Sequence, residues 1–268
     1  MGKPVRWTLK TLCGIFGYEA FRRVNDKELS TLFGMLCPFD TGIPLVRIGA
    51  NSDGGYLIPD DFDGVQACLS PGVAETASFE IALEKRGIPS LLADASVSGP
   101  PLGAEHMRFE KKFVGLQNTG LFTTIDEWVS RHAVTRNGDL ILQMDIEGGE
   151  WAVLPNISSQ LLSRFRIIVC EFHQLESLSN PFAFKIIKEI FERLNTQFVV
   201  AHSHPNNAGG FARVGRFKVP RVLEITFLRR DRIKRLAPRS NFPHPNDFDN
   251  APSLPTFILP EYFYRFPQ

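Results

Sequence analysis

The sequence predicts an α/β fold with a mainly parallel, doubly wound sheet of seven strands. Short β-rich runs alternate with helix-length amphipathic runs from about residue 65 onward, the pattern of strand–helix–strand units. The run at 139–145 is apolar at nearly every position, as expected of a strand covered on both faces. The last two strand-like runs, 196–203 and 221–230, have no helix-length pattern between them. They are therefore expected to pair as an antiparallel hairpin at one edge of the sheet.

The other elements follow from local patterns along the chain. The earlier predicted strands are 65–70, 88–94, 111–116, 139–145 and 165–172. The predicted helices are 5–22, 26–36, 75–87, 123–133, 150–163 and 181–195. The tail from Pro238 carries seven of the nineteen prolines and is expected to run extended over the surface. We therefore expect an N-terminal helical extension at 1–40, the α/β domain at 41–237 and a packed tail at 238–268.

Composition limits the classes of protein that this chain can represent. Of the 268 residues, 43% are hydrophobic and 22% charged, which excludes wholesale disorder. The formal net charge of +1 shows no excess of basic residues that could bind a phosphate backbone, so we expect no nucleic-acid partner. The four cysteines are far apart and form no CxxC, which argues against a zinc ribbon or disulfide scaffold and predicts a reduced, cytoplasmic setting. No run reaches the roughly 18 apolar residues of a membrane span.

The segment at 5–24 has the pattern of an amphipathic helix with an apolar Trp/Leu/Ile/Phe face and basic ends. Such a helix could dock on its own domain or on a partner protein. It could also lie on a membrane surface, which would make the protein peripheral to the inner face of the membrane.

Ligands of open parallel sheets bind beyond the carboxyl ends of the strands, so the residues that end each strand are the candidates for a site. The first strand leads to Gly72, which would let the backbone pass close to a ligand or would serve only a tight turn. The second strand ends at Asp94, twenty-two residues later. A carboxylate there could accept hydrogen bonds from a ribose diol or cap a turn. There is no GxGxxG, which disfavours a nicotinamide dinucleotide.

The strongest candidate segment is MDIEGGEW at 144–151, where three carboxylates and two glycines follow the apolar strand. The next two strands end in Glu171 and His173 and in His202 and His204. Residues two apart on a strand point to one face, so each pair can direct both groups into one crevice. These strand ends predict either an oxygen/nitrogen metal site or an acid/base cluster.

The run RIGANSDGGY at 47–56 contains a Gly-Gly turn flanked by Asp53 and Tyr56. This pattern is typical of a β-hairpin. It would also suit a lid over the cofactor crevice.

The run LILQMDIEGGEW at 140–151 resembles the K-x-D-x-E-G-x-E signature of FkbM-type S-adenosylmethionine-dependent O-methyltransferases. The runs RIGANSDGGY, LSPGVAETASFE, TIDEWV, IVCEFHQLE and FPHPNDFDN resemble, in order across 44–265, segments of a bacterial and viral branch associated with surface polysaccharides. The chain departs from the family pattern at Gln143, where a lysine is usual, and its glycine-rich loop is reduced to Gly72. The first 40 residues carry no part of the resemblance.

The resemblance implies a Rossmann-like class I methyltransferase fold and a role for several strand-end residues. Gly72 would approach the methionine part of S-adenosylmethionine, and Asp94 would hold the ribose hydroxyls. Asp145 would lie beside the sulfonium and the incoming hydroxyl. Arg47 and Asp53 would help to close the site.

The function implied is methylation of a sugar hydroxyl on a surface glycan or glycolipid-linked polysaccharide. The catalytic groups would be Asp145 with His173 or His202 as base, or Mg²⁺ or Mn²⁺ held by Asp145, Glu171 and His173. The partners would be the carbohydrate acceptor and, through the N-terminal helices, a glycosyltransferase or a membrane surface. Two alternatives stay open: a metal-dependent hydrolase built on the same cluster, and a non-catalytic partner module of a glycosyltransferase.

Overall fold

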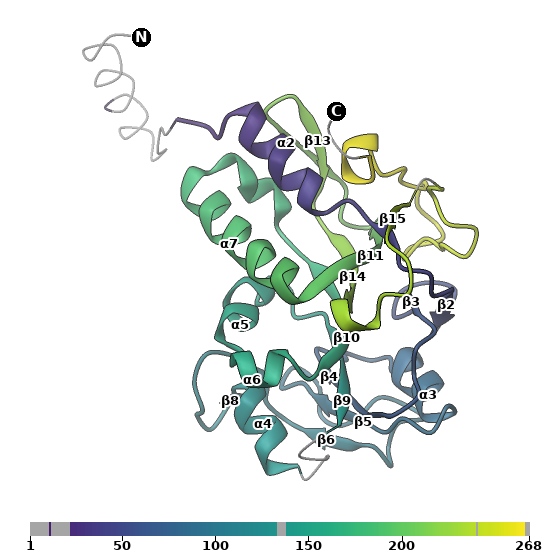
Figure 1. Ribbon diagram of the computed structural model, residues 1–268. Helices are drawn as coiled ribbons and strands as arrows, with labels where there is room; N and C mark the ends of the chain where they lie inside the picture. Colours follow the sequence, from purple (N-terminus) through teal and green to yellow (C-terminus); the bar gives the residue numbers. More distant parts are fainter. Residues whose placement is uncertain (1–10, 12–21, 133–137, 240, 266–268) are drawn as a thin grey trace.

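The computed structural model describes residues 11, 22–132, 138–239 and 241–265 (Figure 1). The predicted helix at 5–22 lies outside the described residues except for its positions 11 and 22. Among the described residues no helix is both long and apolar enough to cross a bilayer.

The centre of the molecule is a seven-stranded sheet in the order β11-β14-β10-β9-β4-β5-β6. Its strands are β4 (Val65–Pro71), β5 (Ser90–Ala93), β6 (Arg108–Glu110), β9 (Asp139–Met144), β10 (Phe165–Phe172), β11 (Phe198–Pro205) and β14 (Leu223–Arg229). Neighbouring strands from β6 to β10 are parallel, whereas β14 is antiparallel to both β10 and β11. The predicted seven-stranded, mainly parallel sheet with an antiparallel edge is confirmed.

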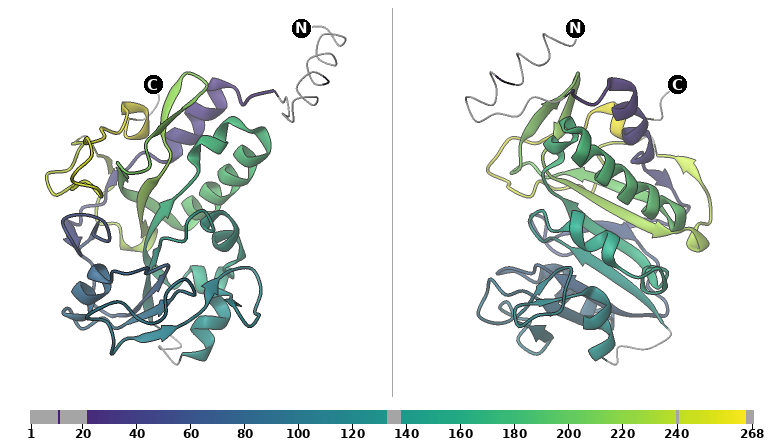
Figure 2. Two further views of the ribbon diagram at one scale, coloured as in Figure 1. Left: turned by 180° about the vertical axis from the view of Figure 1, so that it is seen from behind. Right: turned by 90° about the vertical axis from the view of Figure 1, so that its left-hand side faces the viewer.

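Helices cover one face of this sheet, and a hairpin with one short helix covers the other (Figure 2). The first face packs on α2 (Asp26–Met35), α4 (Ile125–Arg131), α5 (Glu150–Asn156), α6 (Ser159–Leu162) and α7 (Pro181–Gln197). The second packs on the hairpin of β2 (Leu45–Ile48) and β3 (Tyr56–Pro59) and on α3 (Ser78–Glu84). Leu140 and Leu142 of β9 enter the first core, and Ile141 enters the second. This is the two-sided burial predicted from the apolar run.

Three local predictions are wrong, and each error has a structural reason. The third strand is β6 at 108–110, because the more apolar run at 113–116 leaves the sheet: β7 (Phe113–Val114) pairs with β8 (Phe122–Thr123). The single helix predicted at 150–163 is two helices, since Ile157 is extended and the Ser158 side chain caps the second. The predicted loop at 204–218 contains most of a hairpin of β12 (Phe211–Val214) and β13 (Phe217–Pro220).

The tail packs against the body of the molecule. Phe263, in the short helix η3 (Glu261–Phe263), is buried with its ring centroid 4.6 Å from that of Phe33 in α2. Asn250, also in the tail, is buried and contacts Glu224 of β14. The other short elements are β1 (Phe39–Asp40), which pairs with β15 (Ala237–Pro238), η1 (Leu175–Ser179) and η2 (Arg230–Arg232).

Candidate active site

The β4 and β9 backbones come very close together just after these strands end. Gly72 has φ +83°, and a Cβ at this position would lie 1.6 Å from the carbonyl oxygen of Asp145. The Gly72 N–H donates to the carbonyl of Ala93 at 3.0 Å, so Gly72 also joins the first strand to the second. Glycine is therefore required here for packing, and the same residue lines the pocket described next.

A pocket lies at this edge of the sheet, between the β2–β3 loop, the β4–α3 turn and the end of β9. It encloses about 380 Å³, part of which is open solvent. Its lining residues are Asp53, Gly54, Tyr56, Gly72, Val73, Ala74, Thr76, Ser78, Phe79, Glu80, Gln143 and Asp145. Two carboxylates that the sequence singled out, Asp53 and Asp145, therefore meet in one pocket.

The turn after β9 is built around the buried side chain of Glu150. Its Oε1 accepts hydrogen bonds from the backbone N–H of Ile146 at 3.1 Å and of Gly148 at 3.2 Å. Glu147 and Gly148 both have positive φ, +55° and +99°. The two glycines in the sequence suggested an unusual turn, and the backbone has one. The turn leaves Asp145 and Glu147 close to the end of β10.

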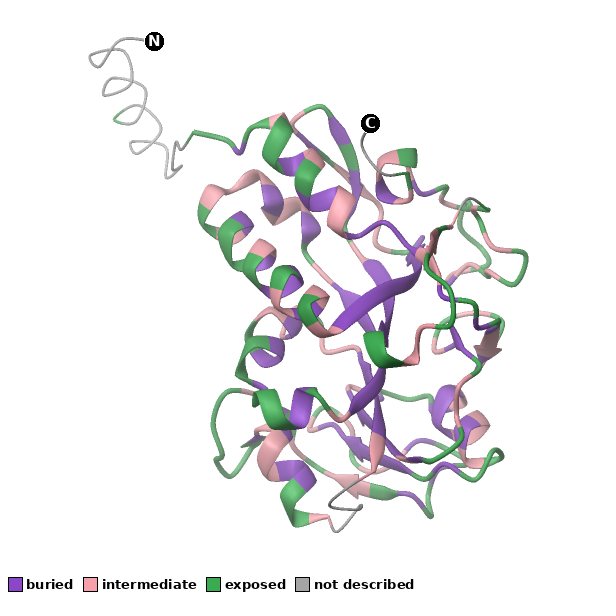
Figure 3. Ribbon diagram, in the orientation of Figure 1, coloured by how far each residue is buried: buried purple, intermediate pink, exposed green. Residues whose placement is uncertain are grey.

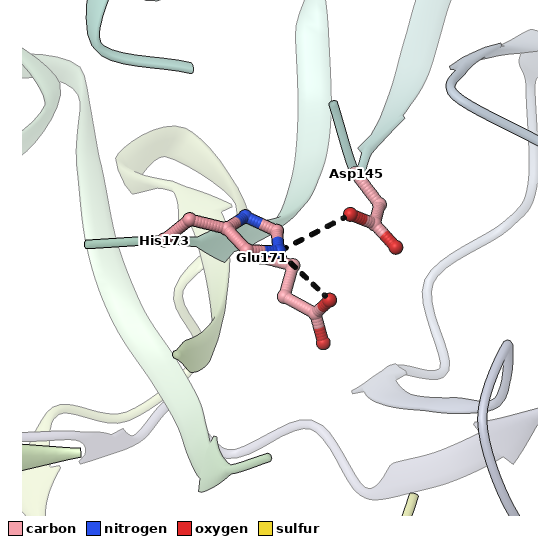
Figure 4. Close-up of side chains that lie close together, drawn as sticks. All are labelled: Asp145, Glu171 and His173. Atoms are coloured by element: carbon pink, nitrogen blue, oxygen red, sulfur yellow. Dashed lines mark ion pairs between the residues drawn. The ribbon is translucent and has the colours of Figure 1, made fainter. Parts of the chain in front are cut away.

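Asp145, Glu171 and His173 come together at the carboxyl ends of β9 and β10 (Figure 4). One ligand atom from each lies within 4.8 Å of the others. His173 Nε2 is 3.7 Å from Asp145 Oδ1 and 3.6 Å from Glu171 Oε2. On the other side of the imidazole, Nδ1 is 3.1 Å from Glu150 Oε1. Glu150 therefore fixes the ring so that Nε2 points to the two carboxylates.

Burial and mutual repulsion shift the pKa values of this cluster. Burial, followed by the charge of Glu171, raises the pKa of Asp145 to about 8. Burial, followed by the charge of Glu224, raises the pKa of Glu171 to about 8. Burial opposes protonation of His173, but its hydrogen bond to Glu150 and the surrounding carboxylates raise its pKa to about 9. All three groups therefore retain protons at neutral pH, unless a bound cation stabilises the two carboxylates in their charged forms and disfavours the imidazolium of His173.

Residues that the sequence analysis did not single out extend the cluster toward the tail. Asn206 Nδ2 donates to Glu171 Oε1 at 3.0 Å. Asn250 Nδ2 donates to Glu224 Oε1 at 2.6 Å and lies 3.3 Å from Asp53 Oδ1. Burial raises the pKa of Glu224 to about 7. Glu224 could have been noticed in the sequence, because it is a charged residue inside the apolar run of β14. No local pattern indicated that Asn250 would contact Glu224.

The other predicted cofactor residues have structural partners. The two Asp94 oxygens accept hydrogen bonds from the N–H of Ala74 at 3.0 Å and from the N–H and hydroxyl of Ser96 at 2.8 and 2.6 Å. This is the turn cap that the sequence left as an alternative to ribose binding, and Asp94 itself does not line the pocket. Arg47 donates to the carbonyls of Ala50 at 2.7 Å and Ser52 at 3.0 Å, so it shapes the loop that carries Asp53.

His202 does not join the cluster that it was predicted to share with Asp145. β14 lies between β10 and β11, so His202 is two strands from His173 rather than one. Its Nε2 is 2.8 Å from Asp247 Oδ1 of the tail, and its ring stacks on Phe242. The prediction that His202 lies beside Asp145 is therefore wrong: its buried side chain contacts the tail instead.

Comparison with known proteins links the centre of this site to one family. Residues 122–198 match the family model described as the methyltransferase FkbM domain, which confirms the resemblance to FkbM methyltransferases over that segment. A solved structure described as "a putative RNA methyltransferase PH1948 from Pyrococcus horikoshii" is similar with 13% identity and a TM-score of 0.32. That comparison covers 62% of this chain and 76% of the other. No curated protein matches the chain. The segment that carries Asp145, Glu150, Glu171 and His173 is thus similar to a methyltransferase FkbM domain.

Proposed function

We propose that this chain is an S-adenosylmethionine-dependent O-methyltransferase that acts on a sugar hydroxyl of a surface glycan or glycolipid-linked polysaccharide. The observation that carries the proposal is the pocket at the carboxyl edge, where Asp145 of the family-matching segment faces Gly72 and Asp53. A methyltransferase domain implies an enzyme with S-adenosylmethionine as methyl donor. The choice of a carbohydrate acceptor rests on the sequence resemblance alone.

In methyl transfer, the acceptor oxygen must be aligned with the methyl group and must lose its proton. S-adenosylmethionine supplies that methyl group on a sulfonium cation. Asp145 lines the pocket, and a cation bound there would favour the charged form of its carboxyl group, whose pKa is otherwise raised to about 8. His173 lies behind it, with Nε2 3.7 Å from Asp145 Oδ1. Because the pKa of His173 is raised to about 9, its imidazole accepts a proton released there only in its deprotonated form, whose share grows with pH. The chain's own residues thus supply charge complementarity and a proton acceptor.

The same cluster fits a divalent cation. Asp145 and Glu171 offer carboxylate oxygens and His173 offers Nε2. These three atoms lie close enough to one another for a single ion to contact all of them. Asp145 Oδ1 is buried with no hydrogen-bond partner among the described residues, as expected of an oxygen reserved for an ion. Carboxylate-rich sites suit hard ions such as Mg²⁺ or Mn²⁺. A bound ion would supply Lewis acidity that makes the acceptor hydroxyl easier to deprotonate.

The function is tested by cofactor binding and by transfer of a labelled methyl group. We expect calorimetry to detect S-adenosylhomocysteine binding to the full chain, and labelled S-adenosylmethionine to label a member of a panel of purified surface glycans. The compact metal-type cluster would equally suit a hydrolase, which needs no S-adenosylmethionine. A chain that binds Mn²⁺ but not S-adenosylhomocysteine would refute the methyltransferase and favour the hydrolase. Binding of neither would favour a non-catalytic partner module.

Glu150→Gln should reduce the methyl-transfer rate by about 10- to 100-fold, the usual effect of removing a carboxylate that orients an active-site histidine. Glutamine keeps the size of Glu150 but removes the charge that raises the pKa of His173. The acid limb of the rate–pH profile should therefore move to lower pH. Steady-state kinetics across pH measures both effects.

Glu147→Gln provides the matched control for this variant. Glu147 lies in the same turn, 3.6 Å from His173 Nε2, but its side chain is 88% exposed and its charge is screened by solvent. Its substitution should alter the pH profile much less. Equal effects of the two substitutions, or an unmoved acid limb in Glu150→Gln, would show that Glu150 has only a structural role.

A further inference from the structure

The loop from β7 to β8, residues 113–122, exposes an unusual concentration of apolar side chains. Of eleven large hydrophobic residues exposed among the described residues, four lie in this loop. They are Phe113, Leu116, Leu121 and Phe122, with exposures of 37, 55, 50 and 40%. The loop beside β8 is drawn as largely exposed in Figure 3. Single exposed apolar residues are ordinary, but a contiguous group marks an interaction surface. We call these four side chains the apolar tip.

Internal hydrogen bonds hold the apolar tip in a defined shape. Phe113 N–H donates to the carbonyl of Leu121 at 2.9 Å, and Gly115 N–H donates to that of Thr123 at 2.8 Å. Thr119 Oγ1 accepts from the N–H of Phe122 at 2.9 Å. A Cβ at Gly115 would lie 2.8 Å from the Phe122 ring, so glycine allows this ring to pack over the backbone. The side chains are thus presented outward by a built scaffold.

The apolar tip leaves the sheet at the same edge as the active-site pocket. The loop begins directly after β6, which is parallel to β5, and the parallel order continues through β4 to β9. Carboxyl ends of parallel strands meet at one edge, so the segment after Glu110 and the segment after Met144 leave the sheet on the same side. A surface that contacts the apolar tip would therefore lie at the edge of the sheet where β9 ends in Asp145.

The docking segment itself, residues 111–122, carries two lysines, Lys111 and Lys112, and no acid. The nearest acids along the chain are Glu110 before it and Asp126 and Glu127 after it. Glu110 is held by Arg131 and His132, each at 2.6 Å. Lys111 makes no ion pair within the part of the chain that the structure describes. An apolar tip with basic neighbours complements a bilayer whose headgroups are anionic and whose interior is apolar.

We propose that residues 111–122 dock this protein on an anionic lipid surface. The four side chains of the apolar tip enter the boundary between headgroups and acyl chains, and Lys111 and Lys112 contact the headgroups. Docking in this way would bring the pocket to a lipid-linked acceptor, a consequence that rests on the proposed function. The lipid contact itself does not depend on that function.

The test is sedimentation of the full chain with vesicles of phosphatidylcholine, with and without phosphatidylglycerol. We expect binding that needs phosphatidylglycerol and weakens with salt. Leu116→Ser/Leu121→Ser should lower the partition coefficient by about tenfold or more, since two apolar side chains no longer enter the lipid. Lys111→Gln/Lys112→Gln should lower it by about tenfold for anionic vesicles only.

The matched control is Leu254→Ser/Ile258→Ser, which removes two exposed apolar side chains of the tail and should leave binding unchanged. Melting temperatures of all variants should match the parent chain, because the changed side chains are exposed. Failure of the parent chain to bind anionic vesicles would overturn the proposal. So would unchanged binding by Leu116→Ser/Leu121→Ser, which would assign the apolar tip to a protein partner or the lipid contact to another segment. The assay contains no methyl donor, so its outcome is separate from that of the transfer assay.

Discussion

Asp145→Asn should lower the rate of methyl transfer by about 100-fold or more while changing the acceptor KM only a few-fold. Asparagine has nearly the same shape, so the turn after β9 is preserved. The substitution removes the negative charge that Asp145 would carry beside a bound cation, together with an oxygen that lies 3.7 Å from His173 Nε2. Both changes weaken the stabilisation of the charge that develops in the transition state as the acceptor attacks. They have less effect on binding of the acceptor in the ground state. Steady-state kinetics with labelled S-adenosylmethionine measures the two constants.

Asp63→Asn is the control for this substitution. Asp63 is exposed in the turn before β4, at the opposite edge of the sheet from the pocket, and its substitution should leave both constants unchanged. Near-normal turnover by Asp145→Asn would show that the active site lies elsewhere. Loss of acceptor binding with normal turnover at saturation would make Asp145 a binding residue only.

The fold was predictable where burial dictates the residue pattern. The strand at 139–145 is apolar on both faces because helices and a hairpin cover it, and the sequence displays that directly. The pattern failed at β6, whose three residues Arg108–Glu110 are mostly polar because they form an edge strand. The strand was predicted at 111–116 because the residues at 113–116 are more apolar, although they are partly exposed in the loop outside the sheet.

The site was predictable to the extent that strand ends define it. Asp145, Glu171 and His173 lie at the carboxyl ends of two adjacent parallel strands, so their proximity follows from fold class alone. His202 was misplaced because strand order is a long-range property: β14 enters the sheet between β10 and β11. The contact of Asn250 with Glu224 joins residues 26 apart through the path of the tail, which no local pattern encodes.

The thermal stability of the metal-free protein should fall as pH rises from about 5.5 to about 8.5. The pKa values of Asp145 and Glu171 are raised to about 8, so the folded state keeps protons that the unfolded chain releases near its usual pKa values of about 4. Raising pH removes these protons at a net loss of stability. The pKa of His173 is raised to about 9, so its stabilising contribution is complete below about 6.5 and is lost as pH rises through 9. All three groups act in the same direction.

Because these three groups are coupled, their contributions do not add, and we expect a combined loss on the order of 3 kcal/mol across this pH range. For a chain of this size that corresponds to a fall in Tm of roughly 10 °C. Mn²⁺ or Mg²⁺ should raise Tm more at pH 8 than at pH 5.5, since metal ligands must be deprotonated. Scanning fluorimetry with a chelator and with each ion measures both effects.

Glu171→Gln isolates the contribution of this cluster from that of other titrating groups. Two histidines that contact the tail also titrate. The pKa of His204 is raised, which makes stability fall with pH, whereas burial lowers the pKa of His202, which makes stability rise with pH. Both effects are present in every variant. The informative quantity is therefore the difference in the Tm–pH slope between the parent chain and Glu171→Gln, and the variant should have the flatter slope. Equal slopes would contradict the proton sharing inferred for the cluster. A parent chain whose Tm no divalent ion changes at pH 8, and which keeps full activity after exhaustive chelation, would exclude the metal and leave His173 as the base.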